Sequence, residues 1–352
     1  MYKKALTTVF SEAPVDDYYE EVDCKELLEA GINGMLSYLD DDYSLYMDQE
    51  ESKSFNEQVE GKYTGVGIEI LIQQDGSVII NRVFEDSPAA KAGLQKDDII
   101  IKVNGEDITT ENAYNVPTMI KDSGKSEAKV TVKRDDKELD FDLKLAVVDI
   151  ESVTTKTFEN NGKKIGYIYM SIFASNSYDQ FKKALTNLEK EKIDSLLIDV
   201  RGNSGGYLAT VTDIASLFLD KNKVIYQLDT KGIVEQVKSK TSASRSYDIV
   251  VLVDRGSASA SEILAAALQE SYGAKVIGTN SYGKGTVQAA YSLSSGSMVK
   301  YTIQKWLTPN GNWINKVGVT PDIEVLLDSN YVENPCDETD TQLQAAITEL
   351  SK

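Results

Sequence analysis

A serine-rich turn that leads into an apolar helical pattern is the first candidate for chemistry in this chain of 352 residues. Residues 256–261 read Gly-Ser-Ala-Ser-Ala-Ser and continue into Glu-Ile-Leu-Ala-Ala-Ala-Leu, so Ser259 could lie at a helix amino terminus. There the helix dipole and the unpaired N–H groups stabilise a developing negative charge. Because a serine at such a place is more often an N-cap than a nucleophile, the run alone is weak support for catalysis.

The absence of histidine restricts what this serine could do. The chain contains no His, which excludes His-dependent triads, Cys–His dyads and most zinc sites. The remaining base for a serine is a lysine whose pKa is lowered by burial. Lys284 is the best candidate, because an extended 284–288 segment would place Lys284, Thr286 and Gln288 on one side. Gln288 could then hold the amine through its carbonyl oxygen.

The glycines around Lys284 allow other interpretations. Gly-Lys-Gly-Thr at 283–286 superficially resembles part of a phosphate-binding loop, and it could equally be an exposed lysine in a glycine-rich turn. The full Gly-x-x-x-x-Gly-Lys-Ser/Thr pattern is absent, so we do not expect nucleotide binding.

A second glycine-rich loop could supply an oxyanion hole. Asn203-Ser204-Gly205-Gly206 precedes a helical pattern, and glycines there let backbone N–H groups approach a carbonyl oxygen closely. The N–H groups of Gly205 and Ala260 would make a two-donor hole. The alternative is an ordinary strand-to-helix turn.

Strands and helices alternate from Lys164 onward, which predicts a largely parallel sheet covered by helices. Ligand sites in such sheets form beyond the carboxyl ends of the strands, where the loops 201–206, 255–261 and 281–285 all fall. The predicted strands are 165–170, 195–200, 249–253 and 275–278, and the predicted helices are 178–190, 208–219 and 259–270.

The sequence before Lys164 predicts a helical segment followed by a module of strands and two helices. Apolar residues at spacings of three and four predict a helix over 25–39, followed by a turn at 43–47 and a second helical stretch through Phe55 and Val59. This segment would be a helical cap on its own protein or a dimer interface. A compact module follows, with predicted strands at 66–72, 77–83, 98–103 and 128–134 and predicted helices at 87–93 and 112–120.

The composition and net charge limit the classes of partner and ligand that the chain is expected to bind. A net charge of −19 without a long basic stretch argues against nucleic-acid binding. No apolar run approaches the length of a membrane span, and the amino terminus opens on polar sequence, so we expect an upstream signal or anchor and a location outside the cytoplasm. Cys24 and Cys336 lack metal-ligand spacing; they are two unremarkable thiols or one pair. Neither a metal nor a cofactor is expected.

Together the three loops resemble those of the carboxy-terminal processing peptidases, also called tail-specific proteases. The resemblance implies Ser259 as nucleophile, Lys284, 25 residues later, as base, and Gln288 as the residue that orients the lysine. It also implies Gly205 as oxyanion glycine, and Glu262 matches an acidic supporting position. The motifs are Asp-Val-Arg-Gly-Asn-Ser-Gly-Gly at 199–206, Gly-Ser-Ala-Ser-Ala-Ser-Glu-Ile at 256–263 and Gly-Thr-Asn-Ser-Tyr-Gly-Lys-Gly-Thr-Val-Gln at 278–288.

By the same resemblance, the middle module is a PDZ domain that holds a peptide's terminal carboxylate on backbone N–H groups while the peptide adds as a strand. Its binding loop would be Gly65, Val66, Gly67 and Ile68, and its helix would begin at Ser87. Relatives often carry Arg-Gly after the second helix, whereas this chain has Lys121-Asp122. Lys121 could act there as a point charge but not as a planar bidentate donor.

The expected organisation is a multidomain α/β (α+β) protein with a crotonase-like protease core. The predicted segments are 1–60 (helical), 61–148 (PDZ), 149–328 (core) and 329–352 (helical). The favoured function is a serine endopeptidase that recognises substrate carboxyl termini and cleaves with a Ser–Lys dyad, with protein or peptide substrates and a homodimer as partners. The alternatives are a catalytically idle PDZ scaffold and a crotonase-type enzyme acting on acyl thioesters.

Overall fold

The computed structural model describes residue 21 and residues 23–121, 126–242 and 245–352. The chain divides into two compact units. The first comprises 1–55, 229–234 and 286–306, and the second comprises 56–228, 235–285 and 307–352. In the described part of the chain, no helix is long and apolar enough to cross a lipid bilayer.

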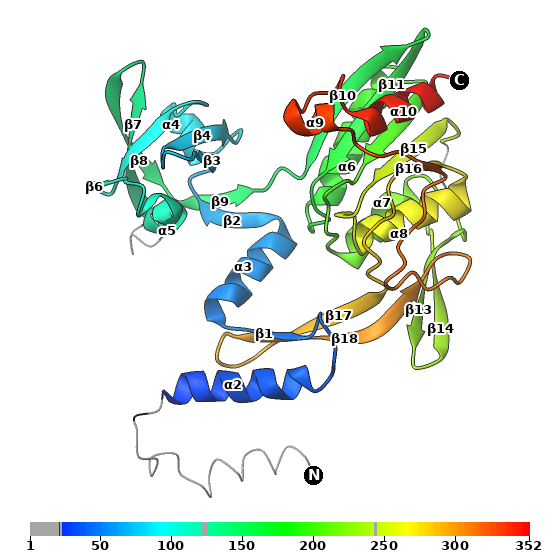
Figure 1. Ribbon diagram of the computed structural model, residues 1–352, viewed down its shortest axis with the longest axis horizontal. Coiled ribbons are helices and arrows are strands. Elements are labelled where there is room, and N and C mark those ends of the chain that lie inside the picture. The colour runs from blue at the N-terminus through cyan, green and yellow to red at the C-terminus, as the bar shows by residue number, and fades with distance from the viewer. Residues whose placement is uncertain (1–20, 22, 122–125, 243–244) are drawn as a thin grey trace, which may run out of the picture. The chain divides into compact units, whose positions relative to one another are not determined.

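A six-stranded sheet forms the centre of the second unit (Figure 1). The edge strand β10 pairs antiparallel with β11, and every later pairing in the sheet is parallel. Its middle strands read Ser-Leu-Leu-Ile-Asp and Asp-Ile-Val-Val-Leu-Val and are buried almost throughout, as expected for strands covered on both faces. In spatial order the strands are β10 (Val153–Asn160), β11 (Lys163–Met170), β12 (Ser195–Asp199), β15 (Asp248–Val253), β16 (Lys275–Gly278) and β19 (Ile323–Glu324).

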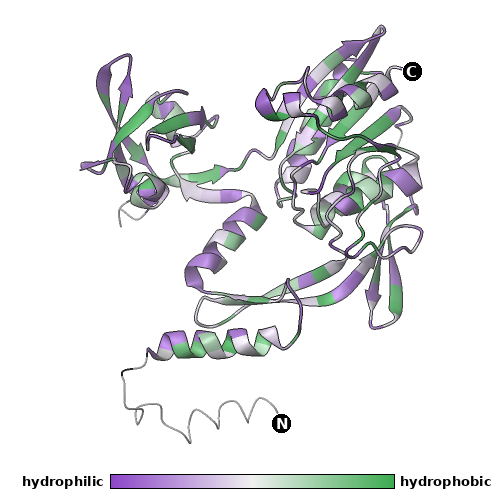
Figure 2. Cartoon of the chain, viewed as in Figure 1, coloured by the Kyte–Doolittle hydropathy of each residue, from purple (hydrophilic) through white to green (hydrophobic). Residues whose placement is uncertain are grey.

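Helices cover this sheet and the carboxyl-terminal helix closes its core. Leu343, Ala346, Ile347 and Leu350 of α10 pack on apolar side chains of β11, β12, β15 and β16, and Figure 2 shows hydrophobic stretches among the strands of this sheet. The helices of this region are α6 (Ser177–Lys190), α7 (Leu208–Ser216), α8 (Ala260–Ala267), which continues as the π-helix η3 (Leu268–Tyr272), α9 (Ser329–Glu333) and α10 (Thr341–Leu350).

The middle module has its own sheet and core. Ser87 caps α4 with Pro88 in its first turn, and Gly93 ends the helix with a φ of 92°, which confirms the predicted start and stop. The sheet order is β3-β4-β5-β7-β8 with β6 beside β5, and β2 pairs separately with β9. The elements are β2 (Lys62–Gly65), β3 (Ile68–Ile72), β4 (Val78–Val83), α4 (Pro88–Ala92), β5 (Ile99–Val103), β6 (Glu106–Asp107), the 3₁₀ turn η2 (Ala113–Asn115), α5 (Val116–Lys121), β7 (Glu127–Arg134), β8 (Lys137–Lys144) and β9 (Ala146–Asp149).

The first unit joins the start of the chain to a late hairpin. The predicted turn at 43–47 is wrong, because Leu45–Met47 is strand β1 and pairs antiparallel with β18. Residues 1–20 of the predicted helical segment lie outside the described residues, and so does Asp122. The elements named here for the first time are α2 (Cys24–Ser37), α3 (Gln49–Glu60), which runs into the second unit, β13 (Val224–Thr230), β14 (Ile233–Lys238), β17 (Thr286–Ser292) and β18 (Met298–Leu307).

Candidate active site

Ser259 lies where β15 turns into α8, at the carboxyl end of the parallel sheet. The turn is held by Asp254, whose Oδ1 accepts the N–H groups of Gly256 and Ser257 at 2.9 and 3.0 Å and that of Gly202 at 2.9 Å. Ser259 itself adopts a φ of 53° and a ψ of −111°. Such a conformation is strained for a residue with a side chain, and strain of this kind concentrates at functional positions.

The other two serines of the run have structural contacts. Ser257 is fully buried and its hydroxyl donates to Val200 O at 2.8 Å. Ser261 is also fully buried and its hydroxyl donates to Asn203 O at 2.8 Å. Ser259 is only half-buried. Of the three hydroxyls, the middle one is therefore the most accessible to a substrate.

The buried carboxylate of Glu262 joins the serine turn to the lysine loop. Its Oε2 accepts the backbone N–H of Ser259 at 2.8 Å and that of Lys284 at 2.9 Å. Its Oε1 accepts the N–H of Gly283 at 2.7 Å and the hydroxyl of Ser281 at 2.5 Å. Because one carboxylate accepts from both loops, the backbones of Ser259 and Lys284 are held close together.

Lys284 is half-buried in a loop with little space around its neighbours. A Cβ at Gly283, whose φ is 90°, would lie 2.9 to 3.0 Å from backbone nitrogens of residues 316–318. On the other side, the Gly285 N–H donates to Asn315 Oδ1 at 3.1 Å and its carbonyl accepts from Trp313 Nε1 at 2.8 Å. Glycine is therefore required on both sides of Lys284 by close packing against residues 313–318.

Gly205 also lies against the serine turn. A Cβ at Gly205, whose φ is 106°, would lie 2.8 Å from Ser259 Cβ and 3.0 Å from Ala260 N. The two predicted oxyanion positions, Gly205 and Ala260, are thus adjacent. The Gly205 N–H, however, donates to Asn203 Oδ1 at 2.9 Å, a contact that sequence reasoning did not anticipate.

Gln288 belongs to the first unit, in β17. Its Nε2 donates to Thr286 Oγ1 at 2.9 Å and to Thr302 Oγ1 at 3.0 Å. Both amide hydrogens are thereby engaged, and the remaining polar atom of the side chain is the acceptor Oε1. The predicted extended 284–288 segment becomes a strand only from Thr286, and a bulge follows between Val287 and Gln288.

A hydrogen-bond network that was not predicted from the sequence joins the 199–206 loop to the carboxyl-terminal helix. Half-buried Arg201 donates to Asp199 through Nε and Nη2, the latter at 2.7 Å, and to Asp340, the N-cap of α10, and Gln342 of α10 at 3.0 Å each. Hydrogen bonds and the charges of Asp199 and Asp340 raise the pKa of Arg201 although its burial acts the other way. The Asp-Val-Arg motif at 199–201 contains two residues of this network. Nothing near the motif in the sequence indicates that Arg201 also contacts Asp340.

The predicted peptide loop lines a small groove of about 70 Å³ in the PDZ-like module. Apolar residues of β3 and α5 form its sides, and Lys121 lies at its rim and pairs with Glu57 at 3.1 Å. The groove is lined by Tyr63, Gly65, Val66, Gly67, Ile68, Ile70, Pro117, Ile120 and Lys121. All four predicted loop residues therefore border one cavity.

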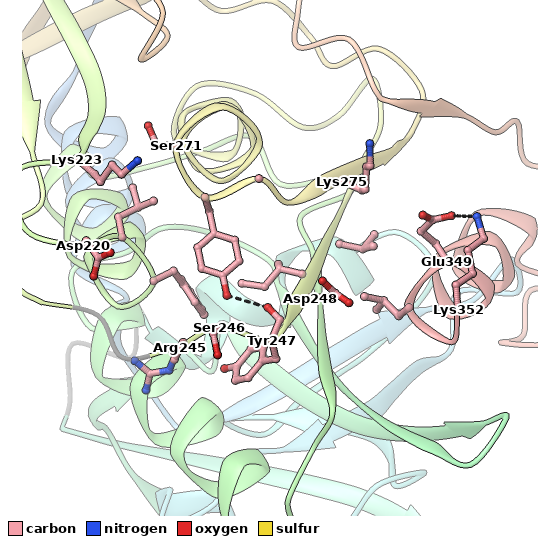
Figure 3. A pocket seen from close by; sticks show the side chains of 17 residues that line it. Asp220, Lys223, Arg245, Ser246, Tyr247, Asp248, Ser271, Lys275, Glu349 and Lys352 are labelled. Atoms are coloured by element: carbon pink, nitrogen blue, oxygen red, sulfur yellow. Dashed lines mark hydrogen bonds and ion pairs between the residues drawn. The ribbon is translucent and has the colours of Figure 1, made fainter.

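A larger pocket of about 720 Å³ lies at the amino-terminal ends of two parallel strands of the central sheet (Figure 3). Asp248 and Lys275, which line it, are the first residues of β15 and β16. The serine and lysine loops follow the other ends of these strands. Since ligands of open parallel sheets bind beyond the carboxyl ends, this pocket is not the candidate active site. Its Arg245 is already paired with Glu189 at 2.6 Å.

Three family models match successive parts of the chain. The model of peptidase family S41 matches residues 164–325, the PDZ domain model matches residues 64–145, and the model of the activating protease CtpB N-terminal domain matches residues 9–51. The predicted mixed α/β class with a PDZ domain is confirmed.

Whole-chain similarity agrees with these matches. The carboxy-terminal processing protease CtpB of Bacillus subtilis is 41% identical over 313 residues, which cover 88% of this chain and 65% of that protein. CtpA of the same organism is 36% identical over 334 residues, which cover 94% of this chain and 71% of that protein. The chain thus spans about two thirds of the length of these relatives.

A solved structure, the photosystem II D1 C-terminal processing protease, is similar with a TM-score of 0.54 at 26% identity, covering 100% of this chain and 91% of that one. The resemblance inferred from the three loop motifs is therefore confirmed. The chain belongs to the family of PDZ-containing carboxy-terminal processing proteases.

Proposed function

We propose that the chain is a serine endopeptidase in which Ser259 is the nucleophile and Lys284 the general base. The observation that carries this assignment is the arrangement around Glu262, whose carboxylate accepts the backbone N–H groups of both residues. The use of the neighbouring hydroxyls of Ser257 and Ser261 in buried hydrogen bonds also supports it. Family membership supports peptidase chemistry at this site.

In this mechanism the neutral Lys284 amine takes the Ser259 hydroxyl proton as Oγ attacks the scissile carbonyl carbon. The resulting ammonium then gives the proton to the leaving amine as the C–N bond breaks, which leaves an acyl ester on Ser259. Water, deprotonated by the same amine, attacks the ester, and the proton returns to Ser259 as the acid product leaves. Gln288 would orient the amine through Oε1.

The developing oxyanion would be stabilised by the N–H groups of Gly205 and Ala260. Ala260 is the first residue of α8, so its N–H points out of the helix end, where the dipole also favours negative charge. The Gly205 N–H donates to Asn203 Oδ1 at 2.9 Å. Binding of the scissile carbonyl would replace this hydrogen bond or share its hydrogen.

The PDZ-like module would capture the carboxyl terminus of a protein or peptide substrate. Its groove combines a glycine-containing loop with apolar walls from Ile68, Ile70 and Ile120, which suits an extended peptide with an apolar last residue. Lys121 would add a positive charge at the rim. Substrates would be unstructured at the terminus, since only an extended strand can be added to a sheet edge.

Cleavage of an unstructured protein with an apolar carboxyl terminus tests this function. The intact chain is compared with Ser259→Ala, Lys284→Ala and the matched control Lys190→Ala, whose side chain is exposed at the end of α6. Both active-site variants should lose about 10⁴-fold or more in kcat/KM while the control keeps full activity. Binding of the terminus without any turnover by the intact chain would favour the idle peptide-binding scaffold instead.

We also propose that the first unit mediates a homodimer through α2. Leu28 and Met35 of this helix, and Leu39 just after its end, are each about half exposed, and Figure 2 shows hydrophobic and hydrophilic stretches along the helix. Exposed apolar side chains that line one element mark association surfaces. Light scattering should give twice the chain mass, and Met35→Glu should reduce it to that of one chain. A monomer at micromolar concentration would contradict the proposal.

A further inference from the structure

Tyr63 lies directly beside the loop proposed to hold a substrate's carboxyl terminus. It belongs to β2, where it pairs with Val148 of β9. Its ring lies against Gly65, the first glycine of the loop. A Cβ at Gly65 would lie 2.5 Å from Tyr63 Cε2 and 2.9 Å from Cδ2. Gly65 is therefore required by the space that the ring occupies, and the ring forms one wall of the groove.

The phenol oxygen of Tyr63 is buried and has no hydrogen-bond partner among the residues that the structure describes. A buried hydroxyl without a partner is destabilising, and native proteins rarely leave one unless a ligand or water completes it. The backbone N–H of Gly67 lies close enough to lower the pKa of this phenol, although it does not meet hydrogen-bond geometry. The hydroxyl thus lies next to the loop whose N–H groups would bind a carboxylate.

Charged groups of both signs lie around the ring, and the phenol remains a neutral donor among them. Burial raises the pKa of Tyr63 to about 12, with smaller contributions from Glu57 and Glu69, so the phenol keeps its proton at neutral pH and can act as a donor. Lys121 Nζ lies 5.6 Å from the centre of the same ring. An incoming carboxylate would therefore find a neutral O–H donor and a backbone N–H in one place, beside a lysine that already pairs with Glu57.

We propose that the Tyr63 hydroxyl donates a hydrogen bond to the terminal carboxylate of the bound peptide and thereby selects free carboxyl termini over blocked ones. This role depends on the proposed capture of carboxyl termini by the PDZ-like module. Tyr63 is then a specificity-determining residue beside the backbone N–H groups of the loop. The bound carboxylate would accept from the Tyr63 hydroxyl, which has no hydrogen-bond partner among the described residues.

The test measures binding of two fluorescent peptides by anisotropy. They share one sequence with an apolar last residue, and one ends in a free carboxylate while the other ends in a carboxamide. The full chain carries Ser259→Ala so that the peptides are not cleaved. It is compared with the same chain carrying Tyr63→Phe, and with a control carrying Tyr114→Phe, since Tyr114 is an exposed tyrosine of the same module.

We expect the parent chain and the Tyr114→Phe control to prefer the free carboxylate. Tyr63→Phe should weaken binding of the acid about tenfold, equivalent to about 1.4 kcal/mol, and change binding of the amide little. The acid-to-amide preference should therefore fall, which a general loss of structure would not produce. Peptide-induced thermal stabilisation should fall in parallel.

The two proposals fail in different ways. If the parent chain binds acid and amide equally, capture of the terminus is wrong and the role of Tyr63 falls with it. If the parent chain prefers the acid and Tyr63→Phe keeps the full preference, only the role of Tyr63 is overturned. Equal weakening of both peptides by Tyr63→Phe would assign the tyrosine to packing and would also overturn the proposal.

Discussion

Replacing Glu262 by glutamine perturbs the connection between the serine turn and the lysine loop while changing the side-chain shape very little. The carboxylate is fully buried and accepts four hydrogen bonds, from three backbone N–H groups and one hydroxyl. A glutamine can accept only through one oxygen, and its NH₂ group must face donors on the other side. Whichever way the amide turns, at least one N–H loses its acceptor.

The cost can be worked out from these contacts. The less costly orientation places NH₂ towards Ser281, whose hydroxyl can rotate to accept, and leaves the Gly283 N–H unpaired. An unpaired buried donor costs about 1 to 3 kcal/mol, and the remaining bonds lose their charge-assisted part. We therefore expect Glu262→Gln to lower the free energy of unfolding by about 3 to 5 kcal/mol, and the melting temperature by roughly 10 °C.

Catalysis should be lost along with stability. Because Ser259 and Lys284 are held by the same carboxylate oxygen, a shift of about 1 Å between them would reduce kcat on the order of 10²-fold, with a much smaller change in KM. Differential scanning calorimetry and steady-state kinetics measure both effects, and Glu159→Gln, an exposed glutamate on β10, is the control. An unchanged melting temperature with full kcat would refute the positioning role of Glu262.

Three further predictions concern the same core. The rate of cleavage should rise with pH, because only the neutral Lys284 amine can accept the serine proton, and a flat profile of kcat/KM between pH 6 and 10 would contradict lysine as base. Gly205→Ala should abolish turnover, because a methyl group would lie 2.8 Å from both Ala258 O and Ser259 Cβ, while titration of the free-acid peptide should show unchanged binding. Arg201→Ala should lower the free energy of unfolding in urea by about 3 to 5 kcal/mol, because it leaves the buried carboxylates of Asp199 and Asp340 without their cation. A stability equal to that of the exposed-site control Arg255→Ala would contradict the role of Arg201 in holding the 199–206 loop to α10.

Local sequence patterns predicted the elements that carry the site. The alternation of apolar strands and helices predicted β11, β12, β15 and β16 with boundaries within a few residues, because buried parallel strands read as short apolar runs. The loop containing Gly205 was predicted to need glycine for a close approach of its backbone, and Ser259 Cβ lies 2.8 Å from a hypothetical Cβ at this position. These features depend on residues near one another in the chain.

The features that sequence reasoning missed depend on distant partners. Strand β1 was predicted as a turn because three residues are too few to show a period, and its pairing with β18 comes from residues about 250 positions later. The contact of Arg201 with Asp340 also requires the folded chain. Whether Cys24 and Cys336 are two separate thiols or one pair stays open, since the side chain of Cys24 lies outside the described residues. The predicted location outside the cytoplasm also stays a prediction.

Covalent labelling tests the nucleophile most directly. The intact chain is treated with a fluorophosphonate, digested, and mapped by mass spectrometry. The account predicts one phosphonyl group per chain, on the peptide that contains Ser259, with labelling slowed strongly in Lys284→Ala and absent in Ser259→Ala. Labelling of Ser257 or Ser261, or an unchanged labelling rate in Lys284→Ala, would contradict the Ser259–Lys284 assignment.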